Sequence, residues 1–299
     1  MEEKIKKFVL SRPDVEAAYG YGSGVFKQSG YTDADKPQID LILVVNNLRD
    51  WHIANMKLNK TDYSFIGKNF FTNAKIEKLK GLTGITYLSN IEEDGNVFKY
   101  GTIELNDLYK HLYEWDSFYL PGRFQKTIYP IIENNTLINL VDKNREYALL
   151  LSSYLQKYDV VTKKEILTTL CGLSYMGDTR MKLAENPRKV LNIVEGSYDK
   201  FTKMYNFDVD YIKCIDDDVC VIDKELLRHE LKRLPYELCQ YIMPVIDEKD
   251  EVIKEKIIEY FTILNKEESL NQTIKGLYTN GFVRSVDYAY KKVKKRFKK

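Results

Sequence analysis

The sequence has no long apolar run, little cysteine and little net charge, and two of these absences exclude a class of protein. None of its apolar runs approaches the roughly 20 residues of a membrane-spanning helix, so an integral membrane protein is excluded. The four cysteines form no C-x-x-C pair and do not cluster with the three histidines, which argues against a zinc site and a disulfide framework and fits a reducing compartment. A formal net charge of +2 points to no partner.

Length and composition indicate a soluble protein with two domains, or with one domain and a helical annex. The chain has 299 residues, of which 44% are hydrophobic and 30% charged. Mixed strand and helix patterns give way to mostly helical patterns near residues 135–142. We therefore predict an α+β fold with a mixed sheet at residues 1–138, a mostly helical domain at 139–245 and a helical C-terminal region at 246–299.

A small-residue turn and a buried strand stand out near the N-terminus. Gly22, Ser23 and Gly24 follow a predicted strand at 15–21, and glycines let backbone N–H groups approach a phosphate closely. The apolar run Ile39–Val45 contains one acidic residue, Asp40, whose burial without a partner would be costly. Together these features predict a nucleotide triphosphate and Mg²⁺ site, with the phosphates on the turn and the metal on Asp40.

A Gly-Ser turn, a spacer and an acidic strand, in this order, resemble the nucleotidyltransferase superfamily. The superfamily strand carries two carboxylates, whereas this strand has Asp40 alone, which leaves the remaining metal ligands undefined. Glu104, at the end of a predicted strand at 97–103, is a candidate for the second carboxylate, and a surface position is the favoured alternative. The alternative for the whole motif is a glycine-rich turn before an ordinary buried strand whose Asp caps a neighbouring loop.

Basic residues supply further candidates for contacts with phosphates. Lys99 lies on the predicted strand at 97–103. The segment SFYLPGRFQKTIYP contains a Pro-Gly turn that presents Arg123 and Lys126 between aromatic residues, a pattern suited to a triphosphate or an acceptor phosphate. A basic loop that forms salt bridges to the helices behind it is the alternative. His52, beside Trp51 on a predicted helix, is interpreted as a packing residue.

The helical half of the chain has the element order of a winged helix. A linker at 160–161 separates the first two of three predicted helices, and Thr162 and Glu165 have the spacing of a capping box at the start of the second. The three helices precede two short apolar runs, 211–215 and 219–223, which flank three consecutive aspartates. Because this acidic tip would repel a phosphate backbone, we expect a structural role and no nucleic-acid partner. Between two of the helices, the segment GLSYMGDTRM contains Asp178 and Arg180, which either brace their own loop or reach the nucleotide.

The C-terminal stretch combines an apolar stripe with a basic face. From Arg284 onward it has eight Lys or Arg residues against one Asp, and Val286, Tyr290, Val293 and Phe297 recur at helical spacing. Such a basic amphipathic helix is typical of a reversible anchor on anionic lipid, and a solvated basic tail is the alternative.

Seven motifs in a fixed order resemble the mitochondrial translocator assembly and maintenance family, whose members are peripheral CDP-diacylglycerol synthases. They extend over nearly the whole chain: YGSGVF (21–26), IDLILVV (39–45) with Trp51-His52, KYG (99–101), LPGRFQK (120–126), GLSYMGDTRM (172–181), KVLNIV (189–194) and IKGLYTNG (274–281). The resemblance implies a nucleotidyltransferase domain followed by a winged-helix domain.

The resemblance also implies Mg²⁺-dependent transfer of a cytidylyl group from CTP to phosphatidic acid, with release of pyrophosphate, in phospholipid biosynthesis. In that reaction Gly22, Ser23 and Gly24 would hold the triphosphate, and Asp40 would bind Mg²⁺. The phosphates in the transition state would be neutralised by Lys99, Arg123 and Lys126. Asp178 and Arg180 belong to a matching motif, and we group them with the nucleotide-binding residues without a defined role.

The first residues contain no transit segment, which leads us to expect a bacterial member at the cytoplasmic face of the membrane. It would bind anionic lipid peripherally through the residues from Lys291 to Lys299, and a eukaryotic member would act at the matrix face of the mitochondrial inner membrane. Two other functions remain open. One is a nucleotidyltransferase with a protein, small-molecule or nucleic-acid acceptor, and the other is a non-catalytic membrane- or DNA-binding module.

Overall fold

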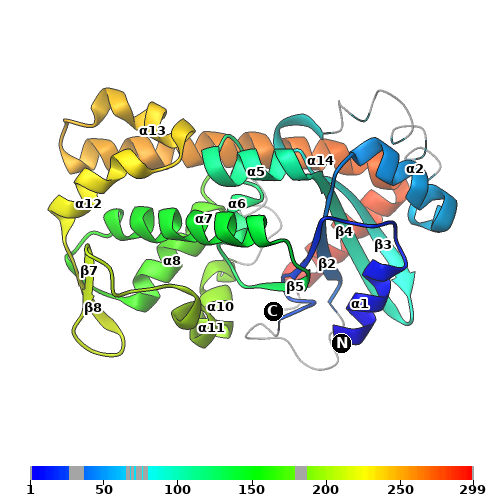
Figure 1. Ribbon diagram of the computed structural model, residues 1–299, viewed down its shortest axis with the longest axis horizontal. Helices are drawn as coiled ribbons and strands as arrows, with labels where there is room; N and C mark the ends of the chain where they lie inside the picture. Colours follow the sequence, from blue (N-terminus) through cyan, green and yellow to red (C-terminus); the bar gives the residue numbers. More distant parts are fainter. Residues whose placement is uncertain are drawn as a thin grey trace.

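The computed structural model of the chain describes residues 2–26, 37–64, 68, 71, 76, 80–178 and 187–297, with side chains up to residue 276. The molecule is elongated, with a five-stranded sheet at one end and a group of helices at the other (Figure 1). The predicted α+β class with a mixed sheet is confirmed. Arg180, most of the polar loop expected at 26–36 and most of the helix or loop expected at 68–79 lie outside the described residues.

The five-stranded sheet has the order β3-β4-β2-β1-β5. Its strands are β1 (Ala17–Tyr21), β2 (Ile39–Val45), β3 (Thr86–Glu93), β4 (Asn96–Glu104) and β5 (Ile128–Ile132). β2 and β4 are parallel, and the other neighbours are antiparallel. The predicted strand at 39–45 is confirmed at both ends, and β3 and β4 form a hairpin around Asp94-Gly95.

Helices cover both faces of this sheet, which explains why β2 is almost entirely apolar. α1 (Glu2–Leu10) and α2 (Leu48–Leu58) pack on one face, together with Leu41 and Leu43 of β2. α5 (Leu105–Glu114), α6 (Pro121–Phe124) and the start of α7 (Asn135–Tyr154) pack on the other face, together with Ile42 and Val44. Successive residues of β2 therefore belong to the hydrophobic clusters on opposite faces of the sheet, as the two-residue period of a strand requires.

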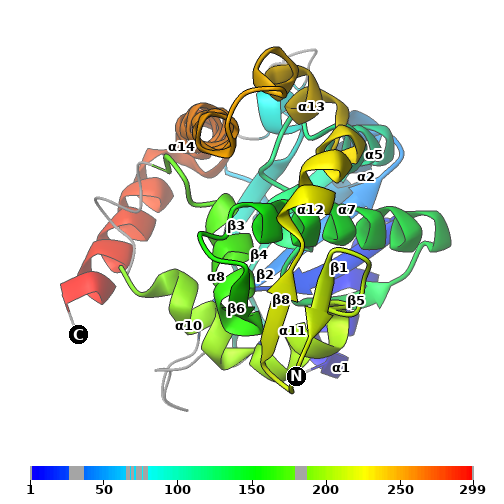
Figure 2. The ribbon, with the colours of Figure 1, turned by 90° about the vertical axis from the view of Figure 1, so that its left-hand side faces the viewer.

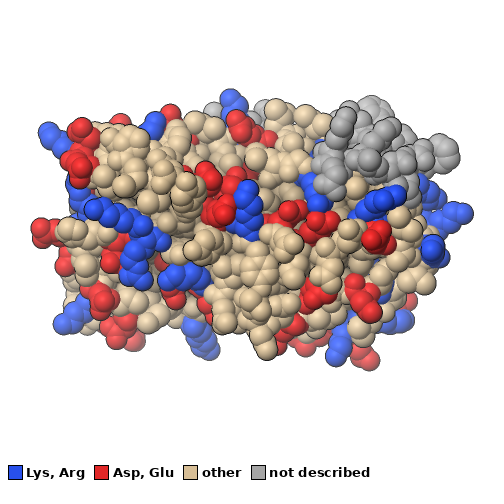
Figure 3. All heavy atoms as spheres, turned by 45° about the horizontal axis from the view of Figure 1, so that its top comes forward, with Lys and Arg blue, Asp and Glu red and all other residues tan. Residues whose placement is uncertain are grey.

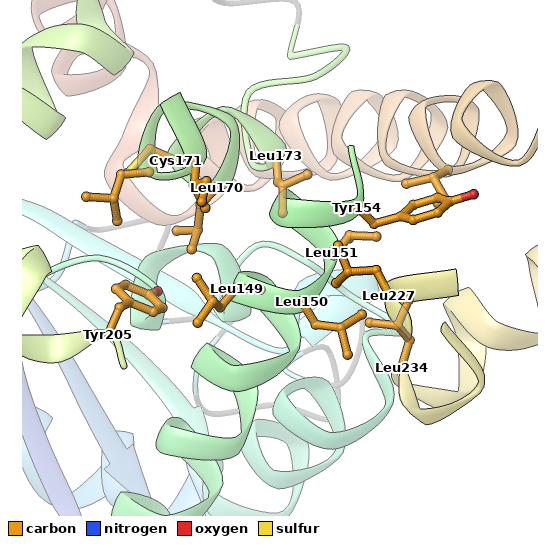
Figure 4. Close-up of a cluster of buried hydrophobic side chains, with 14 of the residues drawn as sticks. Leu149, Leu150, Leu151, Tyr154, Leu170, Cys171, Leu173, Tyr205, Leu227 and Leu234 are labelled. Atoms are coloured by element: carbon orange, nitrogen blue, oxygen red, sulfur yellow. The ribbon is translucent and has the colours of Figure 1, made fainter. Parts of the chain in front are cut away.

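The helical half is built around a second apolar core. α7 and α8 (Lys163–Leu173) contribute Leu151, Tyr154 and Leu170, which belong to one cluster of buried side chains (Figure 4). α10 (Lys189–Gly196) and α11 (Tyr198–Met204) close this core with Val194 and Phe201. The order of helices followed by a hairpin agrees with the prediction, and the assignment to the winged-helix class stays a prediction.

Two expectations for this half were wrong. The segment at 160–161, expected as a linker, belongs to strand β6 (Val160–Thr162), which joins β8 (Val219–Ile222) and β7 (Ile212–Cys214) in a three-stranded sheet. The second error concerns the cysteines, because Cys214 and Cys220 form a disulfide directly across the β7–β8 pair. Their six-residue separation has no motif signature, since the hairpin register alone brings the two residues together.

The last helices connect the two halves of the molecule. α12 (Lys224–Glu230) and α13 (Tyr236–Ile242) lie beside the helical core, and α14 (Asp250–Phe297) runs from there back to the sheet (Figures 1 and 2). Four short 3-10 helices complete the described elements: Lys60–Asp62, Gly81–Thr83, Leu231–Arg233 and Met243–Val245. Within the described part of the chain, no helix is both long enough and apolar enough to cross a membrane.

The division into domains at residues 138 and 245 stays a prediction. α7 begins at Asn135, so the first boundary falls inside a helix. Contacts also cross it, because the Tyr205 hydroxyl of the helical half donates a hydrogen bond of 2.6 Å to the Gln125 carbonyl. On the face seen in Figure 3, basic and acidic side chains are intermixed, which agrees with the small net charge.

Candidate active site

The glycine turn lies directly against the start of β2. Gly22 has a φ of +76°, a left-handed conformation that glycine adopts without strain, and the N–H groups of Val25 and Phe26 donate to its carbonyl at 3.2 and 2.9 Å. A Cβ atom on Gly24 would lie 2.2 Å from the carbonyl oxygen of Gln38. Only glycine therefore lets the turn approach β2 so closely. Whether the turn holds a phosphate stays a prediction.

Asp40 lies beneath this turn and faces Lys99 of the neighbouring strand. The parallel register places Asp40 opposite Lys99, and the Nζ of the lysine is 3.8 Å from Oδ1 of the carboxylate. The Asp40 and Lys99 side chains are 25% and 18% exposed, so the carboxylate, at the start of the strand, avoids the cost of deep burial. A Cβ on Gly22 would lie 3.4 Å from Oδ2 of Asp40, which shows how near the turn is.

Alternate side chains of a strand share one face of the sheet, so Asp40 lies on the face of Ile42 and Val44, which α6 covers. Tyr21 and Lys99 lie opposite Asp40 on the two neighbouring strands and share this face. Burial raises the pKa of Tyr21, the Asp40 carboxylate raises it further, and the positive charges of Lys99 and Arg123 oppose this change. The Tyr21 side chain is thus the place where the three predicted site residues Asp40, Lys99 and Arg123 meet. Its hydroxyl lies 3.3 Å from that of Tyr87.

Arg123 reaches this place from the short helix α6. Its guanidinium carbon lies 3.6 Å from the ring centre of Tyr119 and 5.7 Å from that of Tyr21, and its Nη1 donates to the Tyr119 carbonyl. Stacking on aromatic faces holds the planar guanidinium without neutralising it. Lys99 has a similar contact, because its Nζ lies 4.3 Å from the ring centre of Tyr87.

Lys126 lies one turn further along and contacts the helical half. Its Nζ donates to the carbonyl of Gly122 at 2.5 Å and to the hydroxyl of Ser174 at 2.7 Å. Burial lowers the pKa of Lys126 to about 8, and the nearby positive charges of Arg123 and Lys189 lower it further. Among the described residues, Arg123 and Lys126 contact carbonyls, a hydroxyl and aromatic rings, which favours a phosphate-binding loop over a salt-bridged one.

The segment after α8 is fixed against α14. The side-chain amide of Asn265 donates to the carbonyls of Leu173 and Met176 at 2.8 and 2.9 Å, and a Cβ on Gly177 would lie 2.2 Å from the carbonyl oxygen of Thr262. Asp178 is 4% exposed, and its N–H donates to the Tyr175 carbonyl at 3.3 Å. Because Arg180 lies outside the described residues, the predicted nucleotide-binding role of Asp178 and Arg180 stays a prediction.

Two other candidates from the sequence have structural roles. Glu104 lies opposite Val45, five positions from Asp40 along the parallel pair, and accepts hydrogen bonds from the Leu48 N–H and from Lys80. It is therefore far from the Asp40 carboxylate. His52 is fully buried, and its ring nitrogens lie 2.8 Å from the hydroxyls of Tyr63 and Thr102. Burial lowers its pKa to about 3, so it is neutral and packs as expected.

The donor set at Asp40 suits a metal ion that is completed by substrate. No group of three or more His, Cys, Asp or Glu side chains within the described ranges is placed to hold a metal. Mg²⁺ is commonly bound by one or two carboxylates together with the phosphates of its nucleotide, so a single carboxylate beside a glycine turn is a fitting set. The Ser23 hydroxyl, on the same turn, is a further oxygen in this region.

Sequence reasoning missed three residues at this site: Tyr21, Ser174 and Tyr175. Tyr21 and the Ser174–Tyr175 pair stood inside motifs that the sequence singled out, but their types gave no chemical signal. The signal lay in position, because Tyr21 ends the strand before the turn and Tyr175 follows the end of α8.

Comparison with known proteins identifies a family and several relatives of this chain. Residues 2–230 match the family described as mitochondrial phosphatidate cytidylyltransferase. Relatives with that name include one from Schizosaccharomyces pombe, 32% identical over 99% of this chain and 84% of its own length. One from Mus musculus is 29% identical over 95% of this chain and 91% of its own length. One from Dictyostelium discoideum is 34% identical over 68% of this chain and 52% of its own length.

Proposed function

The chain belongs to the family of mitochondrial phosphatidate cytidylyltransferases, and on that premise we propose that it transfers CMP from CTP to phosphatidic acid. The products are CDP-diacylglycerol and pyrophosphate. The observation that carries this proposal is the meeting of Asp40, Lys99 and Arg123 at Tyr21, directly beneath the glycine turn. One carboxylate, two cations and a close-packed glycine turn are the groups that a nucleotide triphosphate requires.

The glycine turn is the proposed holder of the triphosphate. Its approach to β2, which tolerates no Cβ at Gly24, brings Gly22 next to the Asp40 carboxylate, and backbone N–H groups of such a turn can bind an anion. Asp40 would hold Mg²⁺ together with phosphate oxygens of CTP. When bound, the ion would neutralise negative charge on the phosphates and orient them.

The reaction needs positioning and charge neutralisation more than proton transfer. A phosphatidate oxygen attacks the α-phosphorus of CTP, a new P–O bond forms, and the bond to pyrophosphate breaks. Because the acceptor is already an anion near neutral pH, little help from a general base is required. Lys99, Arg123 and Lys126 would hold the two anionic substrates in line and stabilise the charge on the transferred group.

The lipid acceptor also implies contact with a membrane. Its acyl chains stay in the bilayer while the headgroup enters the site, so the enzyme must rest on the surface that contains its substrate. The residues from Lys291 to Lys299, whose side chains lie outside the described part, are the proposed contact with anionic lipid.

Pyrophosphate release from CTP and Mg²⁺, measured with and without phosphatidate vesicles, tests this proposal. We expect release that depends on the lipid and falls at least a hundredfold in Asp40→Asn, with the thermal midpoint of unfolding unchanged. The matched control is Asp14→Asn, an exposed residue that precedes β1 at its other end, and it should keep full activity.

Three results would contradict the proposal in different ways. Release without lipid would indicate another acceptor. Full activity in Asp40→Asn would remove the carboxylate from the mechanism. No release from a folded wild-type protein would favour a non-catalytic binding module.

A further inference from the structure

Tyr175 lies between two lysines that come from different parts of the chain. The Nζ of Lys126, after α6, is 5.2 Å from the centre of the Tyr175 ring, and the Nζ of Lys189, the first residue of α10, is 5.3 Å from the same centre. Both lysine side chains are half-buried. An aromatic ring attracts a cation without neutralising its charge.

The position of this pair is tightly determined by packing. A Cβ on Gly122 would lie 2.5 Å from Cβ of Ser174, so α6 is pressed against the end of α8. Lys126 crosses this contact and donates to the Ser174 hydroxyl, which places its charge next to Tyr175. Lys189 approaches the same ring from α10.

Lys126 and Lys189 lie on the same ring, and the charges of Arg123 and Lys189 both act on Lys126. Burial is the main cause of the lowered pKa of Lys126, and the charges of Arg123 and Lys189 add to it. The contacts described for the Nζ of Lys126 are to neutral oxygens and a ring, so they leave its positive charge uncompensated. Clustered cations on aromatic supports are the arrangement that an anionic ligand stabilises.

The cations of the site form a series across the two halves of the molecule. Asp40 and Lys99 lie around Tyr21, and Lys126 and Lys189 lie around Tyr175. Arg123 lies between them, because its guanidinium carbon is 5.7 Å from the centre of the Tyr21 ring and its carbonyl accepts a hydrogen bond of 3.0 Å from the Lys126 N–H. Transfer of CMP to phosphatidate joins a phosphate of the nucleotide to the phosphate of the lipid. The two anionic substrates must therefore lie on opposite sides of the group that stabilises the transfer, here Arg123.

We propose that Lys189, together with Lys126 on the Tyr175 ring, binds the phosphate of the phosphatidate acceptor. This assignment rests on the proposed function, and it adds Lys189 and Tyr175 to the site. The nucleotide occupies the side of the glycine turn, and the phosphomonoester of the lipid occupies the side of the helical half. Lys189 is thus a substrate-binding residue supplied by the second half of the chain.

The test compares Lys189→Gln with Lys189→Arg, using a short-chain phosphatidate that is soluble without vesicles. A charge-assisted hydrogen bond to an anion is strong enough that we expect KM for phosphatidate to rise about tenfold or more in Lys189→Gln. KM for CTP should change less than twofold, and Lys189→Arg should restore most of the affinity. The control is Lys164→Gln, an exposed lysine of α8 paired with Glu195, which should change neither constant.

Two other outcomes decide against the assignment. A rise in KM for CTP alone would place the pair on the triphosphate, and a result equal to Lys164→Gln would remove Lys189 from the site. Because Lys189→Gln could fail to fold, its thermal midpoint is measured, and Lys189→Arg supplies the folded comparison. Equilibrium binding of the same phosphatidate, without CTP, is measured in parallel. A wild type that binds phosphatidate through Lys189 without turnover would refute the proposed function alone.

Discussion

At the scale of single residues, Gly24 is the position where one added methyl group has the clearest consequence. The atoms that this methyl group would meet belong to backbone, namely the Gln38 carbonyl at 2.2 Å and the Ile39 Cα at 2.8 Å. Backbone at the start of β2 cannot move without moving Asp40, the next residue of the strand. The fit of the turn is therefore coupled to the position of the carboxylate.

We expect Gly24→Ala to lower kcat/KM for CTP at least tenfold, because the turn must retreat from β2 and carry its N–H groups with it. Steady-state kinetics with CTP as the varied substrate measures this loss. Gly172→Ala is the matched control, since a Cβ there meets nothing within 4 Å and the residue lies in helix α8. That variant should keep its activity and gain up to about 1 kcal/mol of stability. Normal kinetics in Gly24→Ala would show that the turn does not hold the nucleotide.

Residue types with few ordinary structural uses were the ones that the sequence identified. A carboxylate inside an apolar strand and a basic pair in a Pro-Gly loop are costly unless they serve a site, so Asp40, Arg123 and Lys126 stood out. Tyr175 did not, because 23 tyrosines make any one of them unremarkable. Its proximity to Lys126 and Lys189 depends on how three distant segments pack, which no local pattern encodes.

At the scale of elements, α14 is joined to the segment before α6 by a buried carboxyl group. Glu268 is 1% exposed, and its Oε1 accepts hydrogen bonds of 2.6 Å from the Ser117 hydroxyl and from the Phe118 N–H. Burial raises the pKa of Glu268 to about 7, against an ordinary value of 4.5, while these hydrogen bonds and the charge of His111 oppose the rise. The group therefore retains its proton in the folded protein over a pH range where the unfolded chain has lost it.

This difference sets the sign of a pH effect on stability. Between about pH 4.5 and 7 the folded state binds the proton more tightly, so the contribution of Glu268 to stability falls as the pH rises, by up to about 3 kcal/mol. We expect Glu268→Gln to match the wild type at pH 5 and to exceed its thermal midpoint at pH 8, because the amide oxygen still accepts from Ser117 and Phe118. Thermal unfolding of both proteins at the two pH values gives this difference directly.

The neighbouring exposed residue supplies the control for this experiment, since Glu267→Gln changes the net charge equally without touching a buried contact. It should leave the thermal midpoint nearly unchanged at both pH values. A Glu268→Gln protein that loses stability at pH 8 would show that the ionised carboxylate is the stabilising form.

Elements with a strong period and clear ends were predicted well, and short or paired elements were not. β2 agrees because its apolar run has turn residues on both sides, and α8 agrees because Thr162 and Glu165 form the predicted capping box. Strand β6 has three residues, too few for a period to appear, and it is a strand only because β8 lies beside it. The Cys214–Cys220 disulfide depends on the same hairpin register.

At the scale of the whole molecule, α14 links the helical half, the active-site segment and the basic C-terminal end. Its first turns pack in the helical core through Ile253, Ile257 and Phe261. Further along, Lys275 donates to the Thr83 hydroxyl and to the Ile85 carbonyl beside β3. The same helix then continues into the basic stretch that the sequence assigns to the membrane. A contact of that stretch with lipid would therefore hold the site at a fixed height above the bilayer.

We expect removal of the residues from Lys291 to Lys299 to lower activity on anionic vesicles at least tenfold and activity on soluble short-chain phosphatidate less than twofold. The segment contains seven of the eight basic residues that follow position 283, and each is worth ~1 kcal/mol near an anionic surface. Because salt screens this attraction over about 10 Å at 0.1 M, raising the ionic strength should bring the full-length protein on vesicles down to the level of the truncated one. Equal loss on both substrates would mean that the segment supports the fold or the site itself. Full activity of the truncated protein on both substrates would show that the segment is a solvated basic tail. The enzyme would then have to contact the membrane through another surface.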